Sequence, residues 1–350
     1  MKPLLELYNL KKDFPAHAGP FGFTRKHVHA VDDVSLSVAV GETLSVVGES
    51  GCGKSTLARL ILRLVQPTSG QVWLDGWRIN DMPTQQLRRL RGRMQAVFQD
   101  PRASLDPNMR IRDIIAEPLQ NFAIVRGTKA VDARVSELLV KVGLPRSAMT
   151  RFPHELSGGQ CQRIGIARAL ASNPDLIVCD EAVSALDVSV KAQMVNLLSD
   201  LKAEFGMALL FISHDLAVVE HLSDRVAVMY LGALVEIADR ETLFARPSHP
   251  YTRALLNSAP AADPANRGKA ISLRGDPPSP IDVPSGCRFH TRCPYVFDRC
   301  KSEVPAFRAR SGQQFAACHL DELPPLAGPS QRGAHASTPA ATSGAWSGPG

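Results

Sequence analysis

The sequence contains no long hydrophobic run, and no stretch reaches the roughly 18 consecutive apolar residues that a membrane-spanning helix requires. It also shows no secretion signal, because Glu6 interrupts the short apolar stretch near the start. We therefore expect a chain that stays in the cytoplasm. The excess of positive over negative charge is also small. A net charge of +6 over 350 residues is typical of an ordinary solvated surface and does not indicate nucleic-acid binding.

Internal repeats and sustained heptads are also missing, but hydrophobic residues make up 44% of the chain, enough for a buried core. Three short apolar runs, at 43–48, 175–181 and 207–215, are typical of buried parallel strands. An amphipathic pattern over 190–205 predicts a helix between the last two. Because strands and helices alternate, the sequence predicts an α/β fold with a mainly parallel core sheet.

The remaining patterns are more local. Residues 4–10 and 28–38 alternate apolar with polar side chains and predict two strands, joined by a loop rich in glycine, proline and basic residues. Residues 71–79 predict a hairpin that turns at Asp75-Gly76, and 108–143 predicts two helices.

A phosphate-binding motif follows the first buried strand and precedes a helical pattern. It matches G-x-x-x-x-G-K-[ST] and comprises Gly48, Glu49, Ser50, Gly51, Cys52, Gly53, Lys54 and Ser55, followed by Thr56. Its backbone N–H groups would wrap a β-phosphate, Lys54 would reach the β- and γ-phosphates, and Ser55 would offer its hydroxyl to Mg²⁺. The alternative, a chance glycine-rich turn, is disfavoured by the flanking strand and helix.

A pair of carboxylates, Asp180-Glu181, ends the second buried strand. Parallel strands carry ligands at their carboxyl ends, so both side chains should face the phosphate-binding loop. We expect Asp180 to hold Mg²⁺ through water and Glu181 to act as general base on the attacking water. A solvent-exposed acidic pair is the alternative, and the loop upstream argues against it.

A second anion-binding helix start is formed by Ser157, Gly158, Gly159 and Gln160. One nucleotide does not need two such cradles in one chain, whereas two chains packed head to tail would use both. This stretch resembles the signature motif of ATP-binding cassette (ABC) ATPases. The resemblance covers residues 1 to about 258 and implies ATP and Mg²⁺ as ligands.

The resemblance assigns further residues by their order. Gln99 is similar to the glutamine that touches Mg²⁺ and the attacking water, Asp187 to the D-loop aspartate at the dimer seam, and His214 to the switch histidine on the γ-phosphate. Phe14 is similar to the aromatic that stacks on adenine, with Tyr8 and Phe21 as competitors.

Two positions depart from the family pattern. Ala182 stands where proline is usual, and Cys161 stands where arginine or glutamine is usual. Both flank catalytic residues without replacing them, so they put the rate in question rather than the function.

Two longer stretches resemble the oligopeptide and dipeptide importer subfamily: residues 99–119, and the tail at 249–260, 273–295 and 317–320. This implies a second ABC ATPase subunit (a related chain or the same one), two membrane permease subunits and, indirectly, a substrate-binding protein. It places the chain on the cytoplasmic face of the inner membrane, as a peripheral subunit. Nickel and glutathione importers share much of the pattern, and a soluble ABC ATPase that acts on ribosomes or DNA is the more distant alternative.

Four cysteines cluster near the C-terminus with the spacing C-x5-C-x6-C-x17-C: Cys287, Cys293, Cys300 and Cys318. By count alone, four thiolates suit structural zinc and an iron–sulfur cluster equally. The absence of a C-x2-C pair favours iron–sulfur, and the resemblance implies a 4Fe–4S cluster at these positions. Unligated buried thiols and a redox disulfide are the alternatives.

These patterns predict three parts. An ABC ATPase domain comprises residues 1–258 and includes a helical subdomain at about 88–170. A C-terminal extension comprises 259–320, and a disordered tail comprises 321–350.

Overall fold

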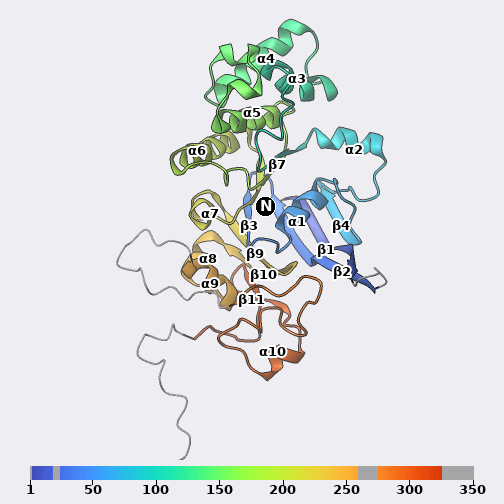
Figure 1. Cartoon of the computed structure of the whole chain (residues 1–350), viewed down its shortest axis with the longest axis vertical. Helices are drawn as coiled ribbons and strands as arrows, with labels where there is room; N and C mark the ends of the chain where they lie inside the picture. Colours follow the sequence, from blue (N-terminus) through green and yellow to red (C-terminus); the bar gives the residue numbers. More distant parts are fainter. Residues whose placement is uncertain (1, 19–23, 259–274, 325–350) are drawn as a thin grey trace, which may run out of the picture.

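A computed structural model describes residues 2–18, 24–258 and 275–324 of the chain (Figure 1). The predicted disordered tail falls almost entirely outside these residues, as do residues 259–274 of the predicted C-terminal extension.

The central sheet confirms the predicted parallel core. Its strand order is β11-β12-β10-β9-β3-β8-β7-β6. The parallel part consists of β9 (Arg225–Tyr230), β3 (Thr43–Val47), β8 (Ala208–Ile212), β7 (Leu176–Asp180) and β6 (Met94–Val97). Three antiparallel strands follow at one edge: β10 (Ala233–Asp239), β12 (Gln314–Ala317) and β11 (Phe307–Ser311).

The strand pairing of β10 ties the C-terminal extension to the core. Glu236 lies opposite Ala316 and Ile237 lies opposite Phe315, so β12 continues the central sheet. The extension is therefore not only a surface appendage, because part of it shares the sheet of the ATPase domain.

A second, antiparallel sheet has the order β2-β1-β4-β5. Its strands are β1 (Pro3–Ala18), β2 (Thr24–Ala39), β4 (Ser69–Leu74) and β5 (Trp77–Arg78). The predicted turn at Asp75-Gly76 is confirmed, and both residues have positive φ, 47° and 79°.

The predicted loop between the first two strands is wrong for most of its length. Residues 11–18 and 24–27 continue the two strands instead. Cross-strand contacts explain the extension: Phe14 lies opposite Val28, and the Asp13 carboxylate lies 2.8 Å from Nδ1 of His29.

Helices surround the central sheet. The two predicted between 108 and 143 are confirmed as α3 (Ile111–Asn121) and α4 (Thr128–Lys141), and the one predicted at 190–205 as α6 (Val188–Phe205). The others are α1 (Lys54–Ile61), α2 (Thr84–Arg91), α5 (Gly158–Leu170), α7 (Leu216–Leu222), α8 (Arg240–Ala245), α9 (Pro250–Ser258) and α10 (Asp298–Ser302), with short 3-10 turns at Arg146–Thr150 and Pro153–Glu155.

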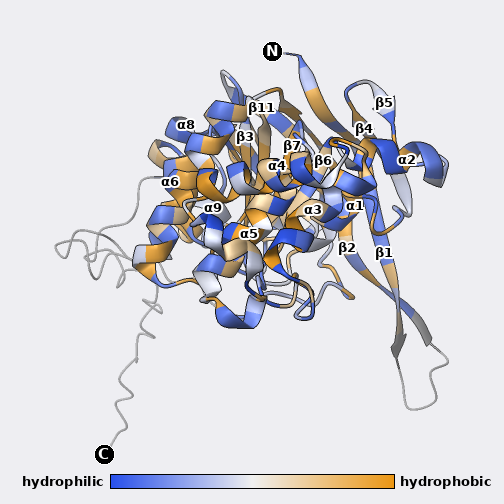
Figure 2. Ribbon diagram, turned by 90° about the horizontal axis from the view of Figure 1, so that it is seen from above, coloured by the Kyte–Doolittle hydropathy of each residue, from blue (hydrophilic) through white to orange (hydrophobic). Residues whose placement is uncertain are grey.

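The helices α3, α4 and α5 gather into a group of their own at one end of the molecule, and the extension with α10 lies at the opposite end (Figure 1). Figure 2 shows that α2 is almost wholly hydrophilic, and Leu87 is its one buried residue. None of the described helices is long and apolar enough to cross a membrane.

The continuous apolar runs of the strands serve two cores, one on each face of the sheet. On β8, Leu209 and Phe211 belong to the core that contains α3 to α6, whereas Leu210 and Ile212 belong to the core that contains α1 and the second sheet. This alternation explains why β8 has no polar face.

Candidate functional site

The phosphate-binding loop connects β3 to α1 and requires its glycines. Gly48 and Gly53 have φ of 152° and 107°. A Cβ atom on Gly53 would lie 2.0 Å from the carbonyl oxygen of Ala30, and one on Gly48 would lie 2.3 Å from that of Met229. The loop is therefore packed between β2 and β9, and a larger residue at either position would displace a neighbouring strand.

Lys54 lies inside this loop. Its side chain is buried, and Nζ donates hydrogen bonds to the carbonyl oxygens of Gly48 (2.8 Å) and Glu49 (2.9 Å). Gly53 precedes α1 and has no side chain to cap the first N–H groups of that helix. Unpaired N–H groups and an ammonium group at one helix start form an anion-binding arrangement.

The expected Mg²⁺ ligands lie together. The Ser55 hydroxyl donates a hydrogen bond of 2.9 Å to the Asp180 carboxylate at the end of β7. Burial raises the pKa of Asp180, and the nearby Glu181 carboxylate raises it further. A carboxylate and a hydroxyl are oxygen ligands of the kind that Mg²⁺ prefers, so these residues fit the ion.

The three expected catalytic side chains also meet. Nε2 of Gln99, which follows β6, lies 3.0 Å from one oxygen of Glu181. Nδ1 of His214, which follows β8, lies 3.5 Å from the other. An amide, a carboxylate and an imidazole thus lie together at the carboxyl ends of three neighbouring parallel strands.

Glu181 is held in an uncommon backbone conformation, with φ of 50°. Its N–H donates to the carbonyl oxygen of Ile212 (3.0 Å), and its own carbonyl accepts from the Ser184 hydroxyl (2.8 Å). Such backbone strain is common at functional sites and here aims the carboxylate at Gln99 and His214.

The second predicted cradle begins α5. Ser157 caps this helix: its hydroxyl accepts from the N–H of Gln160 (3.3 Å), and the Gln160 side chain accepts from the N–H of Ser157 (3.0 Å). A Cβ atom on Gly158 would meet nothing within 4 Å. Within one chain α5 lies with α3 and α4, apart from α1 (Figure 1), so the two cradles are not brought together.

Asp187 caps α6, since its carboxylate accepts from the N–H of Val190 (2.9 Å). Phe14 lies on β1 with the Lys12 ammonium 5.0 Å from its ring centre. Of its competitors, Tyr8 is exposed and bonds to Glu6, and Phe21 lies outside the described residues. The aromatic residue that stacks on adenine stays a prediction.

Two residues of the C-terminal region touch the phosphate-binding loop and were not expected there. The Tyr251 hydroxyl accepts from the N–H of Glu49 (2.8 Å), and the Arg292 guanidinium binds the Glu49 carboxylate. Arg292 lies 243 positions from Glu49 in the sequence, so no local pattern could have indicated the contact.

Comparison with known proteins decides the family. Residues 31–184 match the ABC transporter family model, and residues 235–300 match the model of the oligopeptide/dipeptide transporter C-terminal region. A probable peptide ABC transporter ATP-binding protein, y4tS of Sinorhizobium fredii, is 53% identical over 91% of this chain and 90% of its own. The chain belongs to the ABC transporter family.

Other ABC proteins are similar to this chain over most of its length. The oligopeptide transport ATP-binding protein AppF of Bacillus subtilis is 49% identical over 91% of this chain and 97% of its own. The dimeric ATP-binding cassette MJ0796, solved with ADP and Pi, superposes with a TM-score of 0.59 at 30% identity and covers 67% of this chain and 98% of its own. This ABC protein is therefore an ATPase subunit with the cassette fold, and the family implies a dimer of cassettes together with membrane permeases.

The four C-terminal cysteines are all unpaired, and three are buried: Cys287, Cys300 and Cys318. Burial raises the pKa of Cys287 to about 11 and that of Cys293 to about 12, and neighbouring thiols contribute to both shifts. The thiols therefore lie near one another. However, the described residues contain no group of three or more cysteine, histidine or acidic side chains that could hold a metal ion. The expected iron–sulfur ligand set is therefore not found in this structure.

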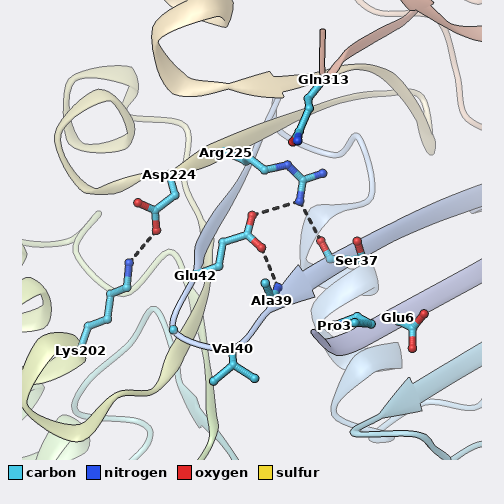
Figure 3. A pocket seen from close by; sticks show the side chains of 11 residues that line it. Pro3, Glu6, Ser37, Ala39, Val40, Glu42, Lys202, Asp224, Arg225 and Gln313 are labelled. Atoms are coloured by element: carbon cyan, nitrogen blue, oxygen red, sulfur yellow. Dashed lines mark hydrogen bonds and ion pairs between the residues drawn. The ribbon is translucent and has the colours of Figure 1, made fainter. Parts of the chain in front are cut away.

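A hollow of about 640 Å³ lies elsewhere on this ABC subunit, beside the residues that precede β3 and β9. Figure 3 shows two ion pairs in its wall, Arg225 with Glu42 and Lys202 with Asp224. Glu42, Asp224 and Arg225 lie at the amino ends of β3 and β9, opposite the end that carries the nucleotide motifs, so we do not assign the hollow to ATP.

Proposed function

We propose that this ABC subunit binds and hydrolyses ATP at the carboxyl edge of its central sheet and thereby drives the uptake of short peptides. The ATP site is supported above all by one observation: Gln99, Glu181 and His214 lie together beside the Ser55–Asp180 pair. The peptide cargo is supported by the C-terminal family match and by the names of relatives such as AppF.

The chemistry follows from these positions. Lys54 and the loop N–H groups bind the phosphates, and Ser55 and Asp180 would hold Mg²⁺, which supplies charge neutralisation when bound. Glu181 accepts a proton from a water molecule as the water oxygen forms its bond to the γ-phosphorus. The bond between the γ-phosphorus and the bridging oxygen breaks, releasing ADP and phosphate. Gln99 orients the water, and His214 stabilises the γ-phosphate oxygens.

The separation of α5 from the phosphate-binding loop supports a head-to-tail dimer. Ser157, Gly158 and Gly159 of one cassette would close over the nucleotide of the partner cassette, with Asp187 at the seam. We propose that the partner is a related chain or a second copy, that two permeases and a substrate-binding protein complete the importer, and that the assembly lies at the cytoplasmic face of the membrane. The division into domains at residues 258 and 320 is part of the same proposal.

Affinity purification from native membranes tests this assembly. We expect two multi-span permeases and a second cassette to co-purify. Recovery of ribosomal proteins or nucleic acid without a membrane partner would favour a soluble ABC ATPase instead.

Growth of a deletion strain tests the cargo. We expect it to lose the use of di- and oligopeptides as a source of a required amino acid, and a plasmid copy to restore growth. Normal growth on peptides with impaired uptake of nickel or glutathione would reassign the cargo while leaving the ATPase intact.

For the cysteine cluster we propose the iron–sulfur assignment that the sequence favours. Its support is the gathering of four reduced thiols in one small segment, although the described side chains do not form a ligand set. Chain purified without oxygen should be brown, absorb at about 400 nm and contain iron. A colourless preparation that contains zinc would replace iron–sulfur with zinc, and one without metal would leave plain buried thiols.

A further inference from the structure

The C-terminal extension reaches the phosphate-binding loop at Glu49. The guanidinium of Arg292 donates two hydrogen bonds, of 2.6 and 3.0 Å, to the two carboxylate oxygens of Glu49. The Arg292 side chain is only 5% exposed, against 25% for Glu49. A bidentate pair of this kind, shielded from water, fixes both direction and distance, unlike an ordinary surface ion pair.

The backbone of Glu49 is held as well. Its N–H donates to the hydroxyl of Tyr251, in the first turn of α9 just ahead of the extension. The Tyr251 ring packs against Tyr230 of β9 (4.7 Å between centroids) and against Phe289 of the extension (5.4 Å). Phe289 is three residues from Arg292, whose guanidinium also lies 6.0 Å from the Tyr230 ring centre. One aromatic block therefore supports both contacts with Glu49.

Glu49 in turn positions the phosphate-binding lysine. Nζ of Lys54 donates to the carbonyl oxygen of Glu49. The loop around it contains Gly48, Gly51 and Gly53, which restrain their own backbone only weakly, so contacts from outside the loop help to set its shape. A binding loop held in advance in its bound shape loses less conformational entropy when the ligand arrives.

We infer that Arg292 and Tyr251 are positioning residues for ATP: by holding Glu49 through its side chain and its backbone, the C-terminal extension sets the shape of the phosphate-binding loop. The extension is thus a determinant of nucleotide affinity and not only an attachment to the cassette. Neither residue touches the reacting atoms, so their loss should weaken ATP binding and leave the chemical step nearly unchanged.

The experiment compares Arg292→Gln with Arg288→Gln in the full chain assembled with its permeases. Arg288 is the matched control, because it lies on the same segment and also anchors the extension, but it bonds to Asp32 and to the carbonyl of Leu231 rather than to the loop. The readouts are KM for ATP and kcat, together with the Kd of MgATP for the full chain.

We expect Arg292→Gln to raise KM and Kd on the order of tenfold with kcat nearly unchanged, Arg292→Lys to lie in between, and Arg288→Gln to match the parent. Glu49→Gln should reproduce the effect of Arg292→Gln, and combining the two should add little, because both remove the same contact. Glu49→Gln also keeps the test open if Arg292→Gln fails to fold.

Unchanged KM and Kd in Arg292→Gln and Glu49→Gln would overturn the inference. An equal rise in Arg288→Gln would overturn it too, since the extension would then act only as general support. Both results concern nucleotide binding alone, so neither bears on the proposed peptide cargo. In the same way, finding a different cargo would not contradict this inference.

Discussion

At the scale of single residues, the motifs of the site impose their own geometry. A glycine-rich loop after a buried strand must place its lysine at the helix start, and residues that end neighbouring parallel strands must share one edge. Gln99, Glu181 and His214 meet for this reason. Arg292 and Tyr251 could not be assigned in the same way, because their roles arise from contacts between segments that lie far apart in the chain.

The Glu181 carboxylate should be essential for hydrolysis but not for binding. Glu181→Gln keeps the hydrogen-bonding shape and removes the base, so we expect ATP hydrolysis to fall by about a hundredfold or more while ATP still binds and the cassette dimer stays closed. Steady-state ATPase rates and nucleotide retention on the purified complex measure both effects. Glu220→Gln, at an exposed position on α7, should behave as the parent. Hydrolysis near the parental rate in Glu181→Gln would remove Glu181 as general base.

At the scale of elements, the sequence predicts the strands and helices that carry strong periodicity and misses those that depend on a partner. The extended ends of β1 and β2 contain Pro15 and two histidines, so their composition resembles that of a loop. The cross-strand pairs Phe14–Val28 and Asp13–His29 override that local preference. β12 was missed for a similar reason, since its strand conformation depends on pairing with β10 and with β11.

A buried polar network joins three of these elements. The Glu236 carboxylate of β10 accepts from the N–H groups of Ser248 and His249, before α9, and from the side chain of Gln314 on β12. Nδ1 of His249 accepts from the N–H of Tyr251 (3.0 Å), which requires this nitrogen to be unprotonated. Burial, with the Arg310 charge adding to it, lowers the pKa of His249 to about 3.

This lowered pKa predicts acid sensitivity. Between about pH 6.5 and 3 the unfolded chain takes up a proton on His249 that the folded chain refuses, so stability is fully present above pH 6.5 and falls as the pH drops. The loss should be about 1 to 2 kcal/mol between pH 7.5 and 5.5. Denaturant unfolding of the full chain at both pH values measures it.

His249→Asn isolates this effect, because asparagine can still accept the Tyr251 hydrogen bond but does not titrate. The variant should lose less stability on acidification than the parent, whereas His221→Asn, at an exposed position, should lose as much as the parent. The parent and the variant must be compared because burial also raises the pKa of Glu236. That shift stabilises the folded chain on acidification and so opposes the effect of His249. Equal acid sensitivity in parent and His249→Asn would contradict the prediction.

At the scale of the whole molecule, the starts of α1 and α5 lie apart in one ABC subunit, so in the proposed head-to-tail dimer they would meet different nucleotides. Gly158→Asp tests this separation. A Cβ atom at this position meets nothing within 4 Å, and an acidic group at the start of α5 interacts favourably with the helix dipole, so the single subunit should fold and bind ATP as before. In the closed dimer the same charge would repel the partner's γ-phosphate.

We therefore expect ATPase activity of the assembled transporter to fall on the order of a hundredfold in Gly158→Asp. Thr128→Asp, at the equivalent position of α4, is the matched control and should retain activity. Full activity in Gly158→Asp would mean that α5 does not close over a nucleotide.

The shared central sheet has a consequence for synthesis of the chain. β10 is complete once residue 239 has emerged, but among the described residues the strand that pairs with its free edge is β12, at 314–317. Until then a nascent cassette exposes unpaired backbone groups on β10, and exposed strand edges recruit other chains. A product terminated between these points should therefore aggregate, which gives the late-made strand a protective role during biogenesis that is separate from transport.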